Sequence, residues 1–599
     1  MGWEAFLCLA VLAAVFVGLV ANRAPDALLL GGVVIVTVFG IISPEEALAG
    51  FSNAGMLTVG ALYVVAAALR ETGTLDTVGA WVLGRAKSER GALLRMAGSV
   101  TVMSAFLNNT PLVAMFIPIV SNWCKKYRVA PSRLLLPLSY LAILGGTCTL
   151  IGTSTNLVVN GLMAEVSKSS STLKEALRPM GFFELGYVGI PYAIVGVTYL
   201  LLIGQRLLPI RKSLMEKLTD SSREYLVNLG VQPGCRLIGQ TIQDAGLRQL
   251  PGLFLIEITR DDQAITPVSP DCVLRANDIL TFTGVVSTIV DLEKIPGLVP
   301  VADEGYEAQA VQRRGRVLCE VVVSPTCPSI GKTIRDADFR ALYNAAVVAV
   351  HRGGERLAGR VGDTILRAGD TLLLQAGAHF VRAQRNNHHF LLVGGLEDSR
   401  PLRHDKALWS LILLIVLVAL MVSGVMEIVL AAFLVAGLMI LARCISVTDA
   451  RRSIDWQTLL TIAAAFGLSK ALVNSGLVGS VTYYLVSLAG HLGPHAVLAC
   501  VYLITAVVTE VVTNNAAAAL VFPFAVGIAQ QIGVHPRPLV MAVTFAASAG
   551  LITPIGYQTN LMVYGPGGYQ LTDFVRVGLP LKILLLTCAT ILIPLVWPF

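Results

Sequence analysis

Long apolar runs, separated by short polar segments, fill both ends of the chain. Their cores recur in windows about 20 residues long, the length that a helix needs to cross roughly 30 Å of hydrocarbon. They lie at Phe6–Leu19, Ala27–Ile42, Leu57–Leu69, Leu134–Leu150, Leu185–Leu202, Leu408–Val422, Ile428–Leu441, Ala496–Val512, Ala516–Ile528 and Leu579–Val596. This pattern predicts a polytopic α-helical membrane protein.

The sequence between about Arg206 and Lys406 has a different character. Polar residues are mixed there with short runs that are typical of β-strands. These runs are Phe254–Thr259, Ile279–Phe282, Ala345–Val350 and Thr371–Leu374. We therefore expect a soluble α+β insert between two membrane halves.

A sequence repeat divides this insert into two modules. The pattern Ile-Gly-x-Thr-Ile-x-Asp-Ala occurs at 238–245 and again at 330–337, 92 positions later (330 − 238). Repetition at a fixed spacing indicates tandem copies of one structural unit. The predicted domains are a first membrane repeat at 1–208, modules at 218–300 and 308–392, and a second membrane repeat at 404–599.

Composition agrees with a membrane protein and argues against several other classes. The 599-residue chain is 55% hydrophobic and 14% charged, whereas about a quarter of the residues in soluble domains are charged. The net charge of +7 comes mainly from short loops and the insert, as expected for anchors of membrane helices, so we expect no nucleic-acid partner. The ten cysteines form no C-x-x-C pair, and no metal-ligand cluster or nucleophile–base pair indicates a cofactor or an enzyme.

Two polar motifs occur in the same order in both membrane halves. Ser-x-x-x-Asn-Asn-Thr at 104–110 matches Thr-x-x-x-Thr-Asn-Asn at 509–515, 405 positions later (509 − 104). Thr-Leu-Ile-Gly-x-x-Thr-Asn-Leu at 149–157 matches Thr-Pro-Ile-Gly-x-x-Thr-Asn-Leu at 553–561, 404 positions later (553 − 149). Corresponding polar interruptions in two hydrophobic halves point to a transporter binding site between structural repeats.

The residue types at these interruptions suit ion binding by neutral groups. Backbone within the hydrocarbon must be internally bonded, so clusters of Gly, Pro, Asn and Thr imply broken helices that are buried or line a cavity. A helix that begins at a break directs free N–H groups toward an anion, and neighbouring hydroxyl, amide and carbonyl oxygens suit sodium. Glu510 is either a gate or proton site, or an acid that faces water or pairs with a basic group.

These features resemble the divalent anion:sodium symporter family, which includes sodium/sulfate and sodium/dicarboxylate carriers. The resemblance covers nearly all of 1–208 and 404–599. It implies two inverted repeats, two re-entrant hairpins, a homodimer and an elevator-like movement of the transport part against a fixed scaffold. It also implies two sodium sites, formed by Ser104, Asn108, Asn109 and backbone near Cys148, and by Thr509, Asn514 and backbone near Ile552.

The same resemblance places the anion between the two motif tips. The residues expected to bind it or to shape the broken helices around it are Asn108, Asn109, Thr110, Thr149, Gly152, Thr153, Thr155, Asn156, Thr513, Asn514, Asn515, Thr553, Pro554, Gly556, Thr559 and Asn560. Both tips depart from the usual Ser-Asn-Thr. Because each tip receives one carboxylate in the dicarboxylate carriers, these departures argue against that substrate, and members of the family with tandem regulator-like inserts resemble the sulfate-transporting branch. We therefore rank sulfate first, dicarboxylates second and other oxyanions third.

The two insert modules resemble the TrkA-type C-terminal regulator domain. The resemblance rests on the turn Leu-Arg-Ala-x-Asp at 274–278 and Leu-Arg-Ala-Gly-Asp at 366–370, each before an apolar strand. It implies that the insert at 209–405 is cytoplasmic, beneath a plasma or inner membrane, and acts in dimerisation or in sensing a small ligand such as a nucleotide. Two scaffolding modules without a ligand are the alternative.

Other functions stay open at this point. Regulator domains of this type also gate potassium channels, and Thr58-Val59-Gly60 matches part of a potassium filter, although its apolar continuation favours a helix. An anion exchanger or a metalloid efflux protein on a related architecture would not depend on sodium. A membrane sensor that signals through the insert would leave the duplicated motifs without a purpose.

Overall fold

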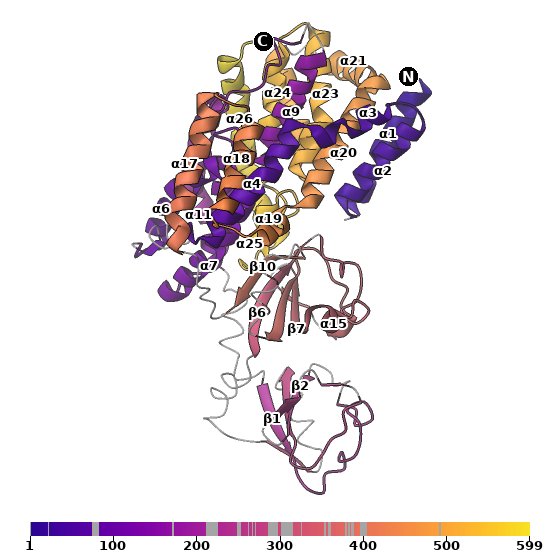
Figure 1. The fold of residues 1–599 in the computed structure, drawn as a ribbon, viewed down its shortest axis with the longest axis vertical. Coiled ribbons are helices and arrows are strands. Elements are labelled where there is room, and N and C mark those ends of the chain that lie inside the picture. The colour runs from indigo at the N-terminus through magenta and orange to yellow at the C-terminus, as the bar shows by residue number, and fades with distance from the viewer. Residues whose placement is uncertain are drawn as a thin grey trace. The chain divides into compact units, whose positions relative to one another are not determined.

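The chain, described from a computed structural model, divides into two compact units (Figure 1). One unit contains residues 1–211 and 399–599, and the other contains 212–398. The structure describes residues 2–599 except 22, 75–78, 80–82, 85, 170–172, 211–225, 248–252, 261–262, 266–267, 270, 285–296, 301–315, 325, 353–354, 358–360, 378–379, 381–383, 385–388, 396–403 and 490–492. The module boundaries predicted at 218 and 308 lie outside the described residues.

The described residues of the first membrane half are mainly helical. The helices are α1 (Trp3–Val20), α2 (Pro25–Val38), α3 (Pro44–Leu48), α4 (Ala54–Glu71), α6 (Glu89–Phe106), α7 (Asn109–Tyr127), α8 (Leu135–Gly146), α9 (Ser154–Ser169), α10 (Gly186–Tyr199) and α11 (Gln205–Leu207). Side-chain caps fix several starts. Ser88 Oγ accepts from the N–H of Gly91 at the start of α6, and Ser43 with Glu46 forms a capping box at α3.

The second membrane half is built in the same way. Its helices are α17 (Ala407–Ser423), α18 (Ile428–Leu441), α19 (Val447–Ser453), α20 (Trp456–Asn474), α21 (Leu477–Ala489), α22 (Pro494–Val508), α23 (Asn514–Ile532), α24 (Pro536–Ala547), α25 (Gln558–Tyr564) and α26 (Leu571–Val596). Gly424 and Gly533 end α17 and α23 in the left-handed conformation that glycine adopts without strain.

In the described residues, five helical stretches are long and apolar enough to cross a bilayer. They are Pro44–Glu71, Gly186–Leu207, Trp456–Asn474, Asn514–Ile532 and Leu571–Val596. Shorter apolar helices accompany them in both halves. The chain is therefore a helical integral membrane protein, as its apolar pattern predicts.

The structure refines three details of the sequence interpretation. The triplet that resembles a potassium filter lies inside α4, where Thr58 Oγ1 donates to the carbonyl oxygen of Ala54 at 2.6 Å. The apolar runs Leu134–Leu150 and Ala496–Val512 are not continuous helices, because α8 ends at Gly146 and α22 ends at Val508. Next to the end of α8, the hydroxyl of Thr147 donates to the carbonyl oxygen of Leu144 at 2.7 Å and so competes with helical hydrogen bonding.

The two membrane halves interleave rather than form separate bundles. Helix α2 packs against α20, α4 against α18, and α10 against α26. A hydrophobic core shared by α1, α2, α20 and α23 includes Leu29, Val33, Leu468 and Ala516. Residues that are about 400 positions apart in the sequence therefore become neighbours.

The described part of the second unit contains two antiparallel five-stranded sheets. The first has β1 (Leu226–Val231), β2 (Leu253–Arg260), β3 (Gln263–Ile265), β4 (Ile279–Gly284) and β5 (Leu298–Pro300), in the order β3-β2-β4-β1-β5. The second has β6 (Arg316–Val323), β7 (Ala345–Arg352), β8 (Glu355–Arg356), β9 (Thr371–Gly377) and β10 (Phe390–Gly395), in the order β10-β6-β9-β7-β8, with helix α15 (Phe339–Tyr343).

These sheets are two copies of one fold. Read from the other end, the first order is β5-β1-β4-β2-β3, which matches the second strand for strand. Each copy has a buried carboxylate paired with arginine: Asp278 with Arg260 at 2.7 Å, and Asp370 with Arg352 at 2.7 Å. Both members of the second pair lie 92 positions after those of the first (352 − 260), the interval of the sequence repeat.

Candidate functional site

The first motif forms a break between two helices. After α6, the non-helical residues Leu107 and Asn108 turn the chain, and α7 begins at Asn109. Ser104, in the last turn of α6, donates from Oγ to the carbonyl oxygen of Ala142 at 2.7 Å. The same hydroxyl lies 2.6 Å from the side-chain amide of Asn109, and both side chains are fully buried.

The second motif repeats these contacts. Thr509 Oγ1 donates to the carbonyl oxygen of Ala547 at 2.8 Å and to Oδ1 of Asn514 at 3.0 Å, where α23 begins. Ala547 follows Ala142 by the motif spacing of 405 (547 − 142), although neither alanine belongs to a motif. The duplication in the sequence is therefore also a duplication of hydrogen bonds.

The broken segments after α8 and α24 are held by buried asparagines. Asn156 Nδ2 donates to the carbonyl oxygens of Gly146 at 3.1 Å and Thr149 at 2.8 Å. The equivalent contacts, 404 positions later, run from Asn560 Nδ2 to the carbonyl oxygens of Gly550 at 2.9 Å and Thr553 at 3.2 Å. These amides bond carbonyls that the helix break leaves without helical partners.

The motif glycines allow the backbone to approach closely. A Cβ on Gly152 would lie 2.6 Å from the carbonyl oxygen of Gly146. A Cβ on Gly556 would lie 2.9 Å from both Glu510 Oε2 and Thr553 Oγ1. Any larger residue at these two positions must displace the broken segment.

The Asn109 amide meets several oxygens at once. One of its terminal atoms lies 2.6 Å from Ser104 Oγ, 3.1 Å from the Ala142 carbonyl and 3.2 Å from the Gly152 carbonyl, while the other lies 2.5 Å from the Tyr557 hydroxyl. Hydrogen bonding is satisfied best with the nitrogen toward the carbonyls. Half a turn of this amide would place its oxygen beside three neutral oxygens, a donor set of the kind that binds sodium.

Contacts between the halves bring the predicted residues into one region. The Tyr557 hydroxyl, which sequence reasoning missed, lies between Asn109 and Thr153, at 3.2 Å from Thr153 Oγ1. Ser154 Oγ and Thr155 Oγ1 both donate to Asn515 Oδ1, at 3.0 and 3.2 Å. Each tip therefore contacts the broken segment of the opposite half.

Further bonds extend this region. Thr110 Oγ1 donates to Gln558 Oε1 at 3.0 Å. The buried Ser139, also missed from the sequence, donates to Thr559 Oγ1 at 2.8 Å and to Asn560 Oδ1 at 2.7 Å.

The remaining predicted residues lie close to the breaks. Half-buried Asn108 and exposed Thr513 directly precede α7 and α23. Half-buried Cys148 and Ile552 and buried Pro554 belong to the broken segments.

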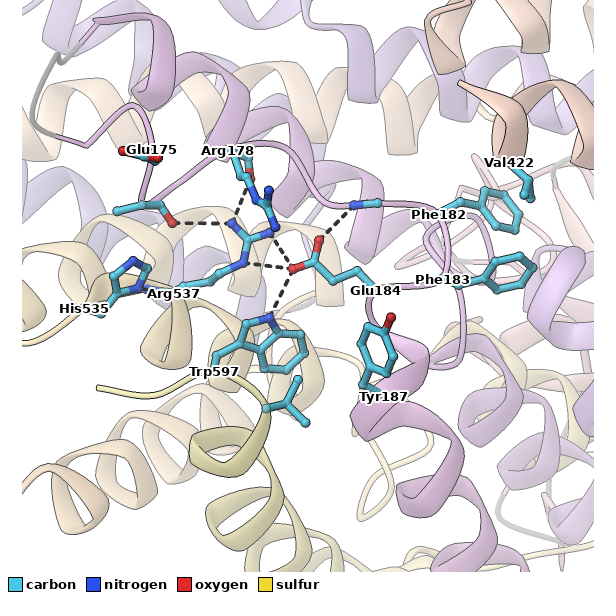
Figure 2. A pocket seen from close by; sticks show the side chains of 13 residues that line it. Glu175, Arg178, Phe182, Phe183, Glu184, Tyr187, Val422, His535, Arg537 and Trp597 are labelled. Atoms are coloured by element: carbon cyan, nitrogen blue, oxygen red, sulfur yellow. Dashed lines mark hydrogen bonds and ion pairs between the residues drawn. The ribbon is translucent and has the colours of Figure 1, made fainter. Parts of the chain in front are cut away.

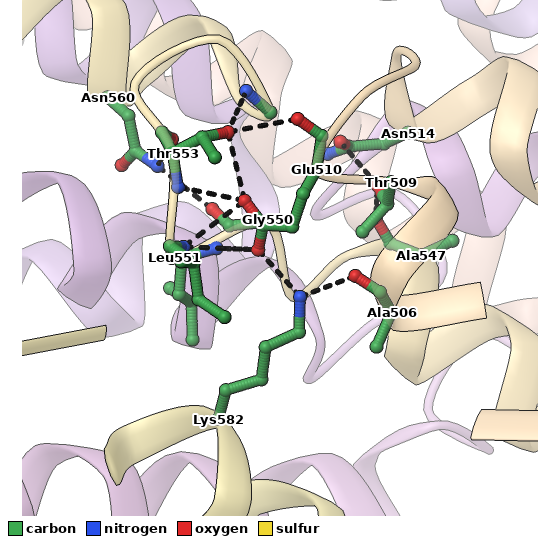
Figure 3. A network of polar contacts seen from close by, with 12 residues as sticks. Ala506, Thr509, Glu510, Asn514, Ala547, Gly550, Leu551, Thr553, Asn560 and Lys582 are labelled. Carbon is green, nitrogen blue, oxygen red and sulfur yellow. Dashed lines mark hydrogen bonds and ion pairs between the residues drawn. The ribbon is translucent and has the colours of Figure 1, made fainter. Parts of the chain in front are cut away.

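Glu510 lies in a buried network beside the second cluster (Figure 3). Its carboxylate accepts from the backbone N–H of Leu551, Ile552 and Thr553 and pairs with Lys582 Nζ at 2.6 Å. The side chains of Glu510 and Lys582 are 10% and 9% exposed. Of the alternatives that the sequence left open, pairing with a basic group is observed and exposure to water is not.

A separate pocket of about 720 Å³ is lined by residues outside the motifs (Figure 2). Glu184 pairs there with Arg537 at 2.6 Å and accepts from Trp597 Nε1 at 3.1 Å. Arg537 also donates to the backbone carbonyls of Ala176 and Arg178. The structure thus satisfies this arginine internally, and the pocket lining contains none of the predicted site residues.

Comparison with known proteins identifies relatives over most of the chain. Residues 9–546 match the family described as "Citrate transporter", CitMHS. The chain is 38% identical to the "Putative sulfur deprivation response regulator" of Chlamydomonas reinhardtii, over 91% of this chain and 93% of that protein. It is 27% identical to "Sodium/sulfate cotransporter 1" of the same alga, over 98% and 89%. The YdaH transporter structure from Alcanivorax borkumensis matches at a TM-score of 0.43 and 12% identity, over 94% of this chain and 87% of that chain.

Proposed function

The chain belongs to the citrate transporter (CitMHS) family of membrane transporters, and from this premise we propose that it is a sodium-coupled symporter of a small divalent anion, with sulfate as the substrate. The observation that carries the proposal is the pair of equivalent clusters around Ser104 with Asn109 and Thr509 with Asn514. Hydroxyl, amide and carbonyl oxygens converge in both, and the oxygens named as ligands come from neutral groups. Such groups suit sodium better than a proton, whose relay requires ionisable side chains.

The anion is proposed to bind between the two tips. Thr110, Thr149, Thr513, Asn515, Thr553 and Pro554 supply or position its contacts, while Gly152, Thr155, Asn156, Gly556, Thr559 and Asn560 support the broken helices. The starts of α7 and α23 direct backbone N–H groups and the positive ends of two helix dipoles toward the breaks. Neutral donors of this kind bind an anion without a buried cation.

Coupling follows from the position of the two asparagines. Sodium binding turns the Asn109 amide and engages the Asn514 amide oxygen, which already faces Thr509, and so fixes the tips that hold the anion, since each asparagine is the first residue of a helix that begins at a break. The affinity for the anion then rises when sodium is bound, and the reverse holds by linkage. Alternating access is proposed to occur by an elevator-like movement of the motif-bearing transport part against a fixed scaffold, and we take the two halves to be inverted repeats with re-entrant hairpins.

The insert is proposed to be a cytoplasmic regulatory element of the TrkA type in a plasma- or inner-membrane homodimer. Two copies of one fold in tandem support a role in dimerisation or in sensing a small ligand such as a nucleotide. Light scattering measures the mass of the purified full-length protein and of a variant that lacks 209–405. A dimer in the first and a monomer in the second would support the role of the insert in dimerisation.

Citrate or a dicarboxylate is the second candidate substrate, favoured by the family description. Uptake of radiolabelled sulfate into proteoliposomes, with unlabelled citrate and succinate as competitors, separates the candidates. Saturable uptake that requires an inward sodium gradient and resists both competitors supports sulfate symport. Saturable uptake that does not depend on the sodium gradient would favour an exchanger. Uptake that does not depend on sodium and does not saturate with sulfate concentration would favour a channel.

Variants of the clusters test the site itself. Asn109→Ala and Asn514→Ala should each weaken activation of uptake by sodium while the protein stays folded. Unchanged sodium activation in both variants would contradict the assignment of the two sodium sites.

A further inference from the structure

The two membrane halves differ at a position beside the broken segment. Glu510 corresponds to Ala105 at the motif spacing of 405 (510 − 105). The backbone carbonyls of the two residues accept equivalent hydrogen bonds. Thr149 Oγ1 donates to the carbonyl oxygen of Ala105, and Thr553 Oγ1 donates to the carbonyl oxygen of Glu510. The second half therefore places a carboxylate where the first half has a methyl group.

A second difference accompanies the first. Val-Gly-x-Pro at 188–191 in α10 recurs at 577–580 in α26, 389 positions later (577 − 188), which aligns Lys582 with Ala193. In both helices the glycine of this pattern lies against a carbonyl of the broken segment, that of Thr147 in one half and Leu551 in the other. Those two carbonyls are themselves equivalent, 404 positions apart (551 − 147).

Glu510 fills a group of donors that is built to hold an anion. Its Oε1 accepts from the N–H of Leu551 at 3.0 Å, and its Oε2 accepts from the N–H and hydroxyl of Thr553 at 2.8 and 3.0 Å (Figure 3). The intervening N–H of Ile552 reaches both oxygens, at 3.1 and 3.2 Å. Successive backbone N–H groups that converge on one point form an anion-binding concavity.

The fold does not require this charge pair. The first half builds a similar break with alanine at both positions, and there the N–H groups of Thr147 and Cys148 donate to the carbonyl oxygens of Leu144 and Gly145 instead of to a carboxylate. Removing two charges from water is expensive, and a buried ion pair is often no more stabilising than apolar residues of similar volume. Stability alone therefore gives no reason for Glu510 and Lys582, whereas their location at the second anion-donor group does.

We infer that Glu510 is an internal anion that occupies the second half's donor group and so sets substrate specificity. This inference rests on the proposed function. An extended dicarboxylate needs a donor group for each of its two carboxylates, but the N–H groups of 551–553 and the hydroxyl of Thr553 are already bonded to Glu510. A second carboxylate placed there would be desolvated without donors and repelled by Glu510.

Lys582 makes the internal anion compatible with transport of an anion. Its ammonium group donates to Glu510 Oε1 at 2.6 Å and to the carbonyl oxygen of Ala506 at 2.5 Å. The pair is neutral as a whole, so it fills the donor group without adding net negative charge to the site. A compact anion with one charged centre, such as sulfate, then binds through the first half and the tips, while Thr553 positions the second broken segment without contacting the anion.

The test removes the pair in two ways in the full-length protein. Glu510→Ala with Lys582→Ala reproduces the first half, and Glu510→Gln with Lys582→Met removes both charges at nearly constant volume. Glu184→Gln with Arg537→Met is the matched control, because that pair is also 2.6 Å apart and buried, with side chains 14% and 6% exposed, and lies in the separate pocket. Each protein is assayed in proteoliposomes for sodium-driven uptake of labelled sulfate in competition with succinate.

The measured quantity is the succinate concentration that halves uptake of labelled sulfate, divided by the sulfate concentration in the assay. We expect this ratio to fall at least tenfold in the alanine double variant and to stay at the wild-type value in the control. Should the alanine variant not fold, the Gln/Met variant is expected to show the same direction of change. A wild-type ratio in a folded variant of the Glu510–Lys582 pair would overturn the inference and leave the proposed function intact. Wild-type protein that takes up succinate and not sulfate would overturn both the proposed substrate and the inference, because Glu510 would then not exclude a dicarboxylate.

Discussion

Replacing Thr509 by valine removes one oxygen from the second cluster and changes the shape of the side chain little. The lost hydroxyl donates to the carbonyl of Ala547 at 2.8 Å and to Asn514 at 3.0 Å, and the residue is fully buried. An interaction between a neutral oxygen and a charged group contributes about 1.5–3 kcal/mol. If Thr509 Oγ1 binds sodium, the concentration of sodium that half-activates uptake should rise by about 10- to 150-fold.

A matched control lies one helical turn away. Thr505 is also fully buried, and its hydroxyl donates to the carbonyl of Val501 at 2.7 Å within α22. Thr505→Val loses the same chemical group and a hydrogen bond that contributes about 1 kcal/mol, but no proposed ligand. Sodium titration of sulfate uptake in both variants, with thermal unfolding as a measure of folding, separates the two effects. Equal shifts in the two variants would refute the ligand role of Thr509.

Three further changes have defined outcomes. Gly152→Ala places a Cβ 2.6 Å from a backbone carbonyl oxygen, so it should lower the free energy of unfolding by about 1–3 kcal/mol and abolish uptake. Gly437→Ala is the control, because a Cβ there meets nothing within 4 Å, and it should change neither. Thermal unfolding and uptake assays check both variants. Tyr557→Phe removes the hydroxyl between the halves and should change the half-activating sodium concentration about fivefold, and a titration that matches wild type would contradict this. Lys582→Met leaves the Glu510 carboxylate buried without its counter-ion and should lower thermal stability by about 3–5 kcal/mol, most of which Glu510→Gln should restore.

The membrane character and the family could be predicted because both are local signals. Apolar runs of spanning length indicated the membrane helices, and two duplicated motifs indicated a sodium-coupled anion carrier. The family match confirms a membrane transporter and the apolar helices confirm the membrane character, while sodium coupling and the identity of the anion stay predictions. Ser104 and Asn109 could be grouped from the sequence because only five positions separate them across one helix break.

The partners of the motif residues could not be predicted in the same way. Ala142 and Ala547 contribute only backbone carbonyls, so no side-chain chemistry distinguishes them from the alanines around them. Tyr557 occupies a variable position of the second motif, and its contact with Asn109 depends on how the halves interleave. A polar residue inside a duplicated motif was the signal that could have identified it.

Lys582 was missed because a single lysine in an apolar run has no local pattern. The short duplication at 188–191 and 577–580 was the available signal, since it aligns Lys582 with an alanine and Glu510 is aligned with another alanine by the first motif. When two opposite charges both occur in one membrane half and both are replaced by alanine in the other half, the sequence predicts that they form an ion pair. Sequence reasoning considered Glu510 alone.

The most direct test of the account is a dual-label flux measurement with the purified protein in proteoliposomes. Labelled sodium and labelled sulfate are followed together, with an inward sodium gradient and no sulfate gradient. Two equivalent oxygen clusters predict that sulfate accumulates against its own gradient and that at least two sodium ions enter with each sulfate. Sulfate that only equilibrates, or sodium entry that is the same with and without sulfate, would contradict sodium-coupled symport.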